Sequence, residues 1–126
     1  MTEIQIRGYH CDAYGHVNNA RILEFYEECR WDFLNKGNKI GYFENLGLQF
    51  FIVNINVDYK LSLEPGMTIK IDCKCHEHGN TSITFLQEIY LEDRLAGKAL
   101  IKFVLFDKNT KKPSKILPEH LSKMQG

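Results

Sequence analysis

The sequence predicts an α+β fold in which one antiparallel sheet wraps around a long central helix. Two observations predict it. Residues 19–36 place apolar side chains at helical spacing around most of the helix circumference, which favours a helix enclosed by other structure. From residue 51 onward the pattern changes to alternation with a period of two, interrupted by turn signals, which is typical of consecutive antiparallel strands.

The chain is expected to begin with a short strand and a structured loop. Residues 3–8 alternate weakly between apolar and polar side chains, as a short strand would. Residues 9–18 contain Gly, Asp, His and Asn, which favour turns over regular structure. We therefore expect this loop to lead directly into the long helix.

The helix predicted over residues 19–36 has recognisable ends. Asn18 or Asn19 can act as its N-cap, because a short amide side chain accepts a hydrogen bond from a free backbone N–H. Gly37 suits the position just after its last turn. The apolar stripe at helical spacing consists of Ile22, Tyr26, Cys29 and Phe33, and Leu23, Phe25, Trp31 and Leu34 extend apolar character around the helix. Such a helix is expected to be buried on most sides.

Four strands are expected after an irregular or short helical connection over residues 38–49. The first alternates over 51–60, and the other three are centred on residues 69–75, 83–91 and 99–105. Turn signals separate them at Glu64-Pro65-Gly66, His78-Gly79-Asn80 and Glu92-Asp93-Arg94. We expect the four strands to form a meander in chain order, followed by a polar segment that ends in a short helix.

Length, composition and charge narrow the class of protein. A chain of 126 residues suits one domain, expected to span residues 1–126, and a hydrophobic content of 44% is typical of a folded protein. The formal net charge of zero argues against nucleic acid as a partner. The first residues contain no apolar signal-peptide core and no apolar run is long enough to span a bilayer, so we expect a cytoplasmic protein with no membrane partner.

The segment that leads into the helix carries the residues suited to chemistry. A helix N-terminus presents free N–H groups and partial positive charge, which can polarise a carbonyl oxygen and stabilise an oxyanion. A carboxylate beside it, such as Asp12, could attack the carbonyl carbon or activate water. Gly15 allows the backbone to turn closely there. Taken alone, Asp12 is more consistent with an aspartate that only caps the loop.

The same segment carries a family resemblance. Residues 9–20, Tyr-His-Cys-Asp-Ala-Tyr-Gly-His-Val-Asn-Asn-Ala, followed by residues 24–30, Glu-Phe-Tyr-Glu-Glu-Cys-Arg, resemble the hotdog-fold acyl-CoA thioesterases of the 4-hydroxybenzoyl-CoA thioesterase type. The resemblance implies that Asp12 is the nucleophile or general base. It also implies that backbone N–H groups at the helix start, Asn19 above all, bind the thioester carbonyl.

The resemblance also suggests which other residues and partners take part. Gly15 and His16 complete the expected catalytic segment, with His16 either organising the loop or contacting substrate. The expected partners are an acyl-CoA or acyl-carrier-protein substrate and a second copy of the chain, as a homodimer or homotetramer. No metal and no cofactor is expected. The candidate substrate-contacting residues are Tyr14, Val17, Asn18 and Tyr59.

One position departs from the family pattern. Many relatives carry an acid two positions before the catalytic carboxylate, and here that residue is His10. The resemblance therefore predicts the class of reaction more firmly than the substrate.

Other constellations are weaker. Cys73, Cys75, His76 and His78 lie close together in sequence, but on a strand they divide between two faces, which disfavours one tetrahedral metal site. Cys11 has no evident base partner, and the neighbouring carboxylate disfavours its thiolate. The late lysines Lys108, Lys111, Lys112 and Lys115 are candidates for CoA phosphates or a solvated charged segment.

The sequence thus predicts an acyl-CoA thioesterase that releases a carboxylic acid and CoA. An acyl-carrier-protein thioesterase would share the chemistry. A hotdog dehydratase is less favoured, because it needs a histidine and an acid arranged for proton transfer at a β-carbon. A non-catalytic hotdog module that binds acyl groups is the alternative from another class.

Overall fold

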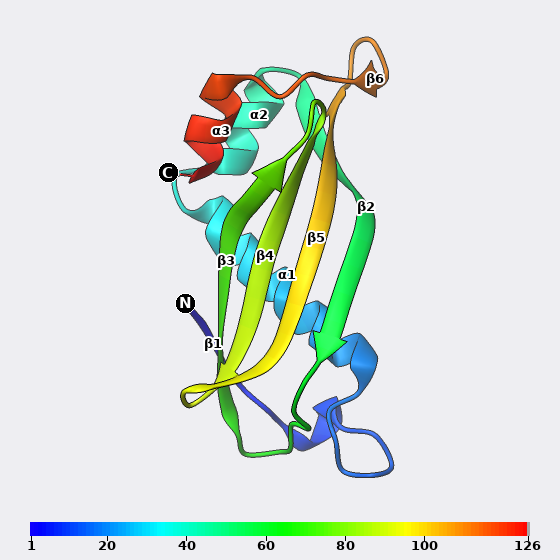
Figure 1. Cartoon of the computed structure of the whole chain (residues 1–126), viewed down its shortest axis with the longest axis vertical. Helices are drawn as coiled ribbons and strands as arrows, with labels where there is room; N and C mark the ends of the chain where they lie inside the picture. Colours follow the sequence, from blue (N-terminus) through cyan, green and yellow to red (C-terminus); the bar gives the residue numbers. More distant parts are fainter. Residues whose placement is uncertain (126) are drawn as a thin grey trace. The chain divides into compact units, whose positions relative to one another are not determined.

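The computed structural model describes residues 1–125. Its strands and α-helices are labelled in Figure 1. After a short first strand come two α-helices, and four long strands follow them. In order, the elements are β1 (Thr2–Gln5), η1 (Gly8–His10, a short 3₁₀ helix), α1 (Asn19–Asn35), α2 (Lys39–Asn45), β2 (Leu48–Tyr59), β3 (Thr68–His78), β4 (Ser82–Leu91), β5 (Arg94–Asp107), β6 (Lys112–Pro113) and α3 (Pro118–Gln125). The predicted helix and all of the predicted strands are present.

The strands form one sheet in the order β1-β3-β4-β5-β2, with β6 paired to β5. Strand β1 runs antiparallel to β3, and Thr2 lies opposite Ile71. The prediction of a meander holds for β3, β4 and β5, which tight turns join, but it is wrong for β2. Strand β2 lies beside β5 at the edge of the sheet. The sequence pattern could not predict this neighbour, because alternation along a strand specifies which face is buried and not which strand it pairs with.

The chain divides into two compact units, each of which contains parts of the long strands. The first unit comprises residues 1–33, 57–73 and 87–99, and the second comprises residues 34–56, 74–86 and the chain from residue 100 onward. The expected single domain spanning the chain remains a prediction.

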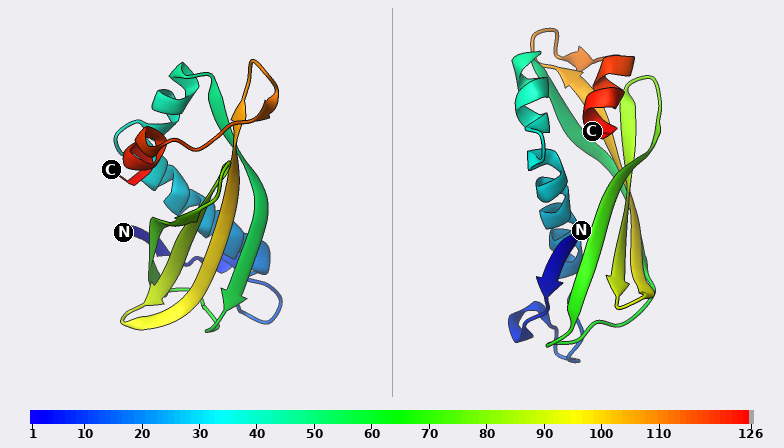
Figure 2. Two further views of the ribbon diagram at one scale, coloured as in Figure 1. Left: turned by 45° about the horizontal axis from the view of Figure 1, so that its top comes forward. Right: turned by 90° about the vertical axis from the view of Figure 1, so that its left-hand side faces the viewer.

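In the first unit, α1 lies on one side of the strands, as the edge-on view in Figure 2 shows. Buried polar groups join the helix to the strands: Gln87 Nε2 donates to the Tyr26 carbonyl oxygen at 2.9 Å. Arg30 Nη1 in turn donates to Gln87 Oε1 at 3.1 Å. The Cys29 thiol lies 3.4 Å from the Ile71 carbonyl oxygen, to which it donates. These contacts fix the helix against β3 and β4.

The prediction that α1 is buried on most sides is only partly right. Ile22, Tyr26 and Cys29 are buried as the stripe predicts, and Phe25 outside the stripe is buried too, whereas Phe33 is only partly buried. Trp31 is 50% exposed, and its Nε1 donates to Glu27 Oε2 at the helix surface. The helix therefore has an exposed face, on which the apolar Leu23 and Trp31 lie partly in solvent.

Tyr26 occupies an unusual place in the core of this unit. Its side chain is 0% exposed, and among residues 1–125 its hydroxyl oxygen has no hydrogen-bond partner. The hydroxyl fits against β5 because residue 97 is glycine: a Cβ atom there would lie 2.9 Å from Tyr26 Oη. Burial raises the pKa of the Tyr26 phenol, and the neighbouring Tyr59 and Asp58 side chains raise it further.

In the second unit, α2 and α3 lie side by side (Figure 1). Lys123 Nζ donates to the Gly37 carbonyl oxygen at 2.8 Å, which joins α3 to the connection between α1 and α2. The buried Phe43 ring packs against Phe50 at 4.8 Å and against His120 at 5.6 Å between ring centroids. The predicted final short helix is thus present, and the connection over residues 38–49, predicted to be irregular or a short helix, contains α2.

Candidate active site

The loop before α1 is a small hairpin. Cys11 and Val17 form an antiparallel bridge, and the Asp12 N–H donates to the His16 carbonyl oxygen at 2.8 Å. At the tip, the Gly15 N–H donates to the Asp12 carbonyl oxygen at 3.1 Å. Gly15 has a φ of +79°, a conformation that glycine adopts without steric cost. The predicted role of Gly15 in the turn is therefore seen in its backbone.

The Asp12 carboxylate is held by this hairpin through one oxygen. Asp12 Oδ1 accepts the Tyr14 N–H at 2.9 Å and the His16 N–H at 3.3 Å. This is the Asx-turn geometry that a short carboxylate forms with its own loop. Among residues 1–125, no donor is recorded for Asp12 Oδ2. The loop-capping interpretation and the catalytic one are thus compatible, because one oxygen orients the group and the other is available.

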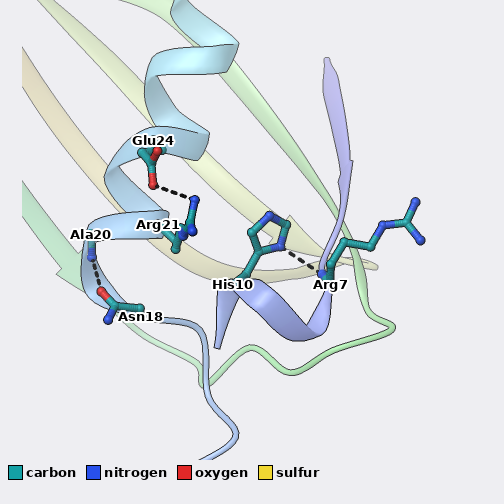
Figure 3. Close-up of polar contacts among 6 residues, drawn as sticks. All are labelled: Arg7, His10, Asn18, Ala20, Arg21 and Glu24. Carbon is teal, nitrogen blue, oxygen red and sulfur yellow. Dashed lines mark hydrogen bonds and ion pairs between the residues drawn. The ribbon is translucent and has the colours of Figure 1, made fainter. Parts of the chain in front are cut away.

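The start of α1 leaves one backbone donor available. Asn18 Oδ1 accepts the Ala20 N–H at 2.8 Å (Figure 3), and the Asn18 carbonyl oxygen accepts the N–H groups of Arg21 and Ile22. Asn18 is therefore the N-cap. Asn19 is the first residue of α1, and within the described chain its N–H has no acceptor. A free N–H at the positive end of a helix suits an oxyanion.

Asp12 and Asn19 open into the same cavity, whose volume is about 300 Å³. A volume of this order lies at the lower end of small-molecule sites. The lining residues come from the hairpin, the start of α1 and the connection from β2 to β3; they are Asp12, His16, Val17, Asn19, Ile22, Tyr59, Lys60, Leu61, Ser62 and Leu63. Five of the sequence-predicted residues therefore meet here: Asp12, His16, Val17, Asn19 and Tyr59.

Three predicted residues do not line the cavity. Tyr14 is 87% exposed, and its N–H rather than its ring contacts Asp12. Gly15 and Asn18 contribute through the backbone turn and the helix cap. Substrate contact by Tyr14 and Asn18 remains a prediction.

The far wall of the cavity, residues 60–63, escaped the sequence analysis. Hydrogen bonds hold it in place: the N–H groups of Lys60 and Leu61 donate to the Ala96 carbonyl oxygen at 3.0 and 3.1 Å. The Val17 N–H donates to the Leu63 carbonyl oxygen at 2.9 Å, which joins this wall to the hairpin. No local motif marks these residues, since the wall is created by long-range backbone pairing.

His10 lies beside the hairpin and outside the cavity lining. Its Nδ1 accepts the Arg7 N–H at 2.9 Å (Figure 3), and its ring packs edge-on against Phe25 at 4.9 Å. Desolvation lowers the pKa of the His10 imidazole, and the nearby Arg21 charge lowers it further. The histidine that replaces the usual acid thus has a packing role.

The His16 imidazole has no recorded hydrogen bond in the described chain; the backbone of His16, not its ring, organises the hairpin. No group of three or more His, Cys, Asp or Glu residues within residues 1–125 is arranged to hold a metal ion. In the same range, no helix has the length and apolar character needed to cross a membrane.

Comparisons with known proteins agree with this architecture. A model of the thioesterase-like superfamily matches residues 6–124. The long-chain acyl-CoA thioesterase FadM of Escherichia coli is 38% identical over 114 residues, which cover 89% of this chain and 86% of FadM. The chain therefore belongs to the thioesterase-like superfamily, and the sequence-based assignment to the thioester hydrolases is confirmed at the level of the family.

Solved structures give the fold. The crystal structure of YbaW, a probable thioesterase from Escherichia coli, has a TM-score of 0.93 and 36% identity, with 99% of this chain and 98% of that chain covered. A Staphylococcus aureus protein solved in complex with CoA has a TM-score of 0.81 at 16% identity, over 98% of this chain and 78% of that one, a likeness of fold alone. The predicted hotdog fold is confirmed.

Proposed function

We propose that this chain is an acyl-CoA thioesterase in which Asp12 and the Asn19 N–H act on opposite sides of the thioester carbonyl group. One observation carries the proposal: Asp12, whose carboxylate is oriented by the hairpin, and Asn19, whose N–H has no acceptor within residues 1–125, both line one cavity of about 300 Å³. A nucleophile or base beside a fixed oxyanion donor is the arrangement that acyl transfer requires.

In the proposed reaction, the thioester carbonyl oxygen accepts the Asn19 N–H, which polarises the carbonyl carbon. Asp12 Oδ2 takes a proton from a water molecule as the water oxygen bonds to that carbon, or attacks the carbon itself and forms an anhydride that water then hydrolyses. The C–S bond breaks, the CoA thiolate takes up a proton, and a carboxylic acid is released. Neither route requires a metal or organic cofactor.

The proposed substrate class follows from the relatives and from the cavity wall. FadM is named for long-chain acyl-CoA, and apolar side chains at Val17, Ile22 and Leu63 line the cavity here. We therefore propose CoA as the carrier and an acyl chain as the group removed. An acyl-carrier-protein thioesterase and a non-catalytic acyl-binding module remain the alternatives.

Purified protein tested with short, medium, long and aromatic acyl-CoAs, with detection of the free thiol, tests this function. We expect turnover that Asp12→Asn lowers by about 10²–10⁴-fold. Acyl-CoA binding without thiol release would favour the non-catalytic module. Turnover confined to acyl-carrier-protein substrates would identify the other carrier.

We also propose that the chain works as a homo-oligomer, and the edge strand β2 supports this. Its side chains are exposed over most of its length, and they include the apolar residues Phe51, Ile52, Val53 and Ile55, each between 43% and 56% exposed. A long apolar edge strand calls for a cover, because its unpaired backbone groups otherwise invite association. A second copy of β2 would supply both backbone partners and apolar contact.

Val53→Lys tests this interface. Lysine on an edge strand opposes strand pairing, so we expect the variant to elute as a monomer in size-exclusion chromatography with light scattering. Lys70→Gln, on the exposed surface of β3, is the matched control that should leave the mass unchanged. A monomeric parent protein would contradict the proposed oligomer. The cytoplasmic location and the single domain over residues 1–126 remain proposals alongside it.

A further inference from the structure

The buried Tyr26 belongs to the helix that lines the candidate active site, although Tyr26 itself is not a lining residue. Along α1, Asn19, Ile22 and Tyr26 share one face, since residues three and four apart lie above one another on a helix. Asn19 and Ile22 line the cavity, and Tyr26 follows one turn later. On the strand side, the position of a Cβ at residue 97 lies 2.9 Å from Tyr26 Oη and 3.5 Å from the carbonyl oxygen of Asp58, the chain neighbour of the cavity-lining Tyr59.

The Tyr26 hydroxyl has no hydrogen-bond partner among residues 1–125, whereas most buried hydroxyls have one. Tyr26 is 0% exposed, and Tyr26 Oη is the buried side-chain oxygen or nitrogen that lacks a hydrogen-bond partner among residues 1–125. A buried polar group without a partner is destabilising, and phenylalanine would fill the same space without that penalty. Such a group is therefore expected where a bound molecule supplies the missing partner.

The strand behind the hydroxyl is shaped to admit it. Residue 97 on β5 is glycine, and a Cβ there would approach Tyr26 Oη to 2.9 Å, while it would lie at 3.5 Å from the Asp58 carbonyl oxygen and 3.6 Å from Ile89 Cδ1. Real Cβ atoms do not make a contact as short as 2.9 Å without a shift of the neighbouring group. Glycine at position 97 thus makes the placement of this hydroxyl possible.

We propose that Tyr26 is a specificity-determining residue whose hydroxyl hydrogen-bonds an oxygen carried on the acyl chain, so that the enzyme prefers oxygenated acyl-CoAs, such as hydroxyacyl thioesters, to plain ones. This inference rests on the proposed thioesterase function. The chain would enter past Ile22 and Tyr59. Tyr26 follows Asn19 by about 10 Å along the helix axis, and its side chain leans back toward the helix start. The recognised oxygen therefore lies several carbons beyond the thioester carbonyl.

The first test compares substrates. Wild-type protein and Tyr26→Phe are assayed with dodecanoyl-CoA and with dodecanoyl-CoAs hydroxylated near the carbonyl, in mid-chain or at the far end. We expect the wild type to favour one hydroxylated isomer by about fivefold to tenfold in kcat/KM, the worth of one neutral hydrogen bond. Tyr26→Phe should lose this preference, measured as the ratio of kcat/KM on the hydroxylated isomer to kcat/KM on dodecanoyl-CoA. Tyr42→Phe, on α2, is the matched control that should retain the preference.

An unchanged preference in Tyr26→Phe, or no preference in the wild type, would overturn the inference. The stability of the free protein gives an independent readout. Tyr26→Phe should melt at the same temperature as the wild type or higher, because it removes an unsatisfied group. A lower melting temperature would mean that the hydroxyl already has a structural partner, which contradicts the proposal.

A binding measurement separates this inference from the proposed function. If the wild type released no thiol from any acyl-CoA, the proposed function would fail. The inference would then be decided by the melting temperatures with free dodecanoic and hydroxydodecanoic acids. A hydroxy acid that stabilises the wild type more than Tyr26→Phe supports the role of Tyr26, and equal stabilisation of the two proteins refutes it.

Discussion

Two polar groups of helix α1 that have no partner among residues 1–125, the Asn19 N–H at its start and the Tyr26 hydroxyl two turns later, differ in their access to water. Asn19 lines an open cavity, so solvent can satisfy its N–H until a substrate arrives. Tyr26 is 0% exposed, so bulk solvent cannot supply a hydrogen-bond partner for its hydroxyl. The first group is available at little cost to stability, whereas the second destabilises the fold while it is unpaired.

The nearby Arg30 and Gln87 side chains show the usual alternative. Both are buried, and they are joined by a hydrogen bond of 3.1 Å, with Gln87 also bonded to the Tyr26 carbonyl oxygen. The same region of the protein therefore satisfies the backbone of Tyr26 but not its side chain. That contrast indicates that the unpaired hydroxyl is a local feature and not the result of loose packing.

The largest effect is expected at Asp12, in the hairpin that leads into α1. Asp12→Asn should lower kcat by about 10²–10⁴-fold, because the amide cannot act as base or nucleophile. Its Oδ1 can still accept the Tyr14 and His16 N–H groups, so the hairpin and the melting temperature should be preserved. Thiol release under single-turnover conditions measures the loss. Asp12→Ala, which removes the turn as well, should lower both activity and stability.

At the buried Tyr26 hydroxyl, Gly97→Ala tests how closely the hydroxyl packs against β5. The added Cβ would lie 2.9 Å from Tyr26 Oη, and overpacking of this kind costs about 1–3 kcal/mol. In the double variant with Tyr26→Phe, most of this loss should disappear, because the clashing atom is gone. Urea unfolding of the four proteins gives the coupling energy. Additive losses would show that the contact at residue 97 does not involve the hydroxyl.

A smaller effect is expected from the helix cap. Asn18→Ala removes the acceptor of the Ala20 N–H and should cost about 1 kcal/mol of stability, as loss of an N-cap usually does. It frees the Ala20 N–H and does not remove the neighbouring Asn19 N–H, the proposed oxyanion donor. The kcat on acyl-CoA should therefore fall only a few-fold. Asn18→Asp, which keeps the capping oxygen, is the control. A fall in kcat as large as that of Asp12→Asn would assign Asn18 a direct chemical role.

The smallest effect concerns pH. Burial lowers the pKa of His10, and also that of His120, below the usual 6.5, so the unfolded chain binds more protons than the folded one in mildly acidic solution. Their contribution to stability is complete above about pH 6.5 and is lost as the pH falls. Urea midpoints measured between about pH 5 and 7 should therefore rise with pH. His10→Gln should flatten that slope, and an unchanged slope would exclude His10 as a source.

The sequence could predict the site where its residues are adjacent in the chain. Asp12 and Asn19 are linked by a short hairpin, so one motif identified both of them. The wall at residues 60–63 is brought to them by backbone hydrogen bonds from Lys60 and Leu61 to Ala96 and from Val17 to Leu63, which no local pattern encodes. The neighbour of β2 was missed for the same reason, because strand alternation does not specify pairing partners.

Burial on α1 was predicted correctly for most of the apolar stripe but not for Trp31 or Arg30. Ile22, Tyr26 and Cys29 are buried as their spacing requires. Arg30 is also buried, since Gln87 on β4 supplies an acceptor that helical spacing cannot reveal. Trp31 is exposed although it is the most bulky apolar residue of the helix, because position on the helix outweighs residue type.

The Asx turn at Asp12 has a consequence for which acid the site can use. Its Oδ1 reaches the N–H groups of Tyr14 and His16 because only one methylene separates the carboxylate from the backbone. The reference pKa values of aspartate and glutamate side chains differ by only a fraction of a unit. The longer glutamate side chain, however, would have to fold back to form the same hydrogen-bonded turn. The choice of aspartate at this position is therefore a matter of length, set by the hairpin and not by proton affinity.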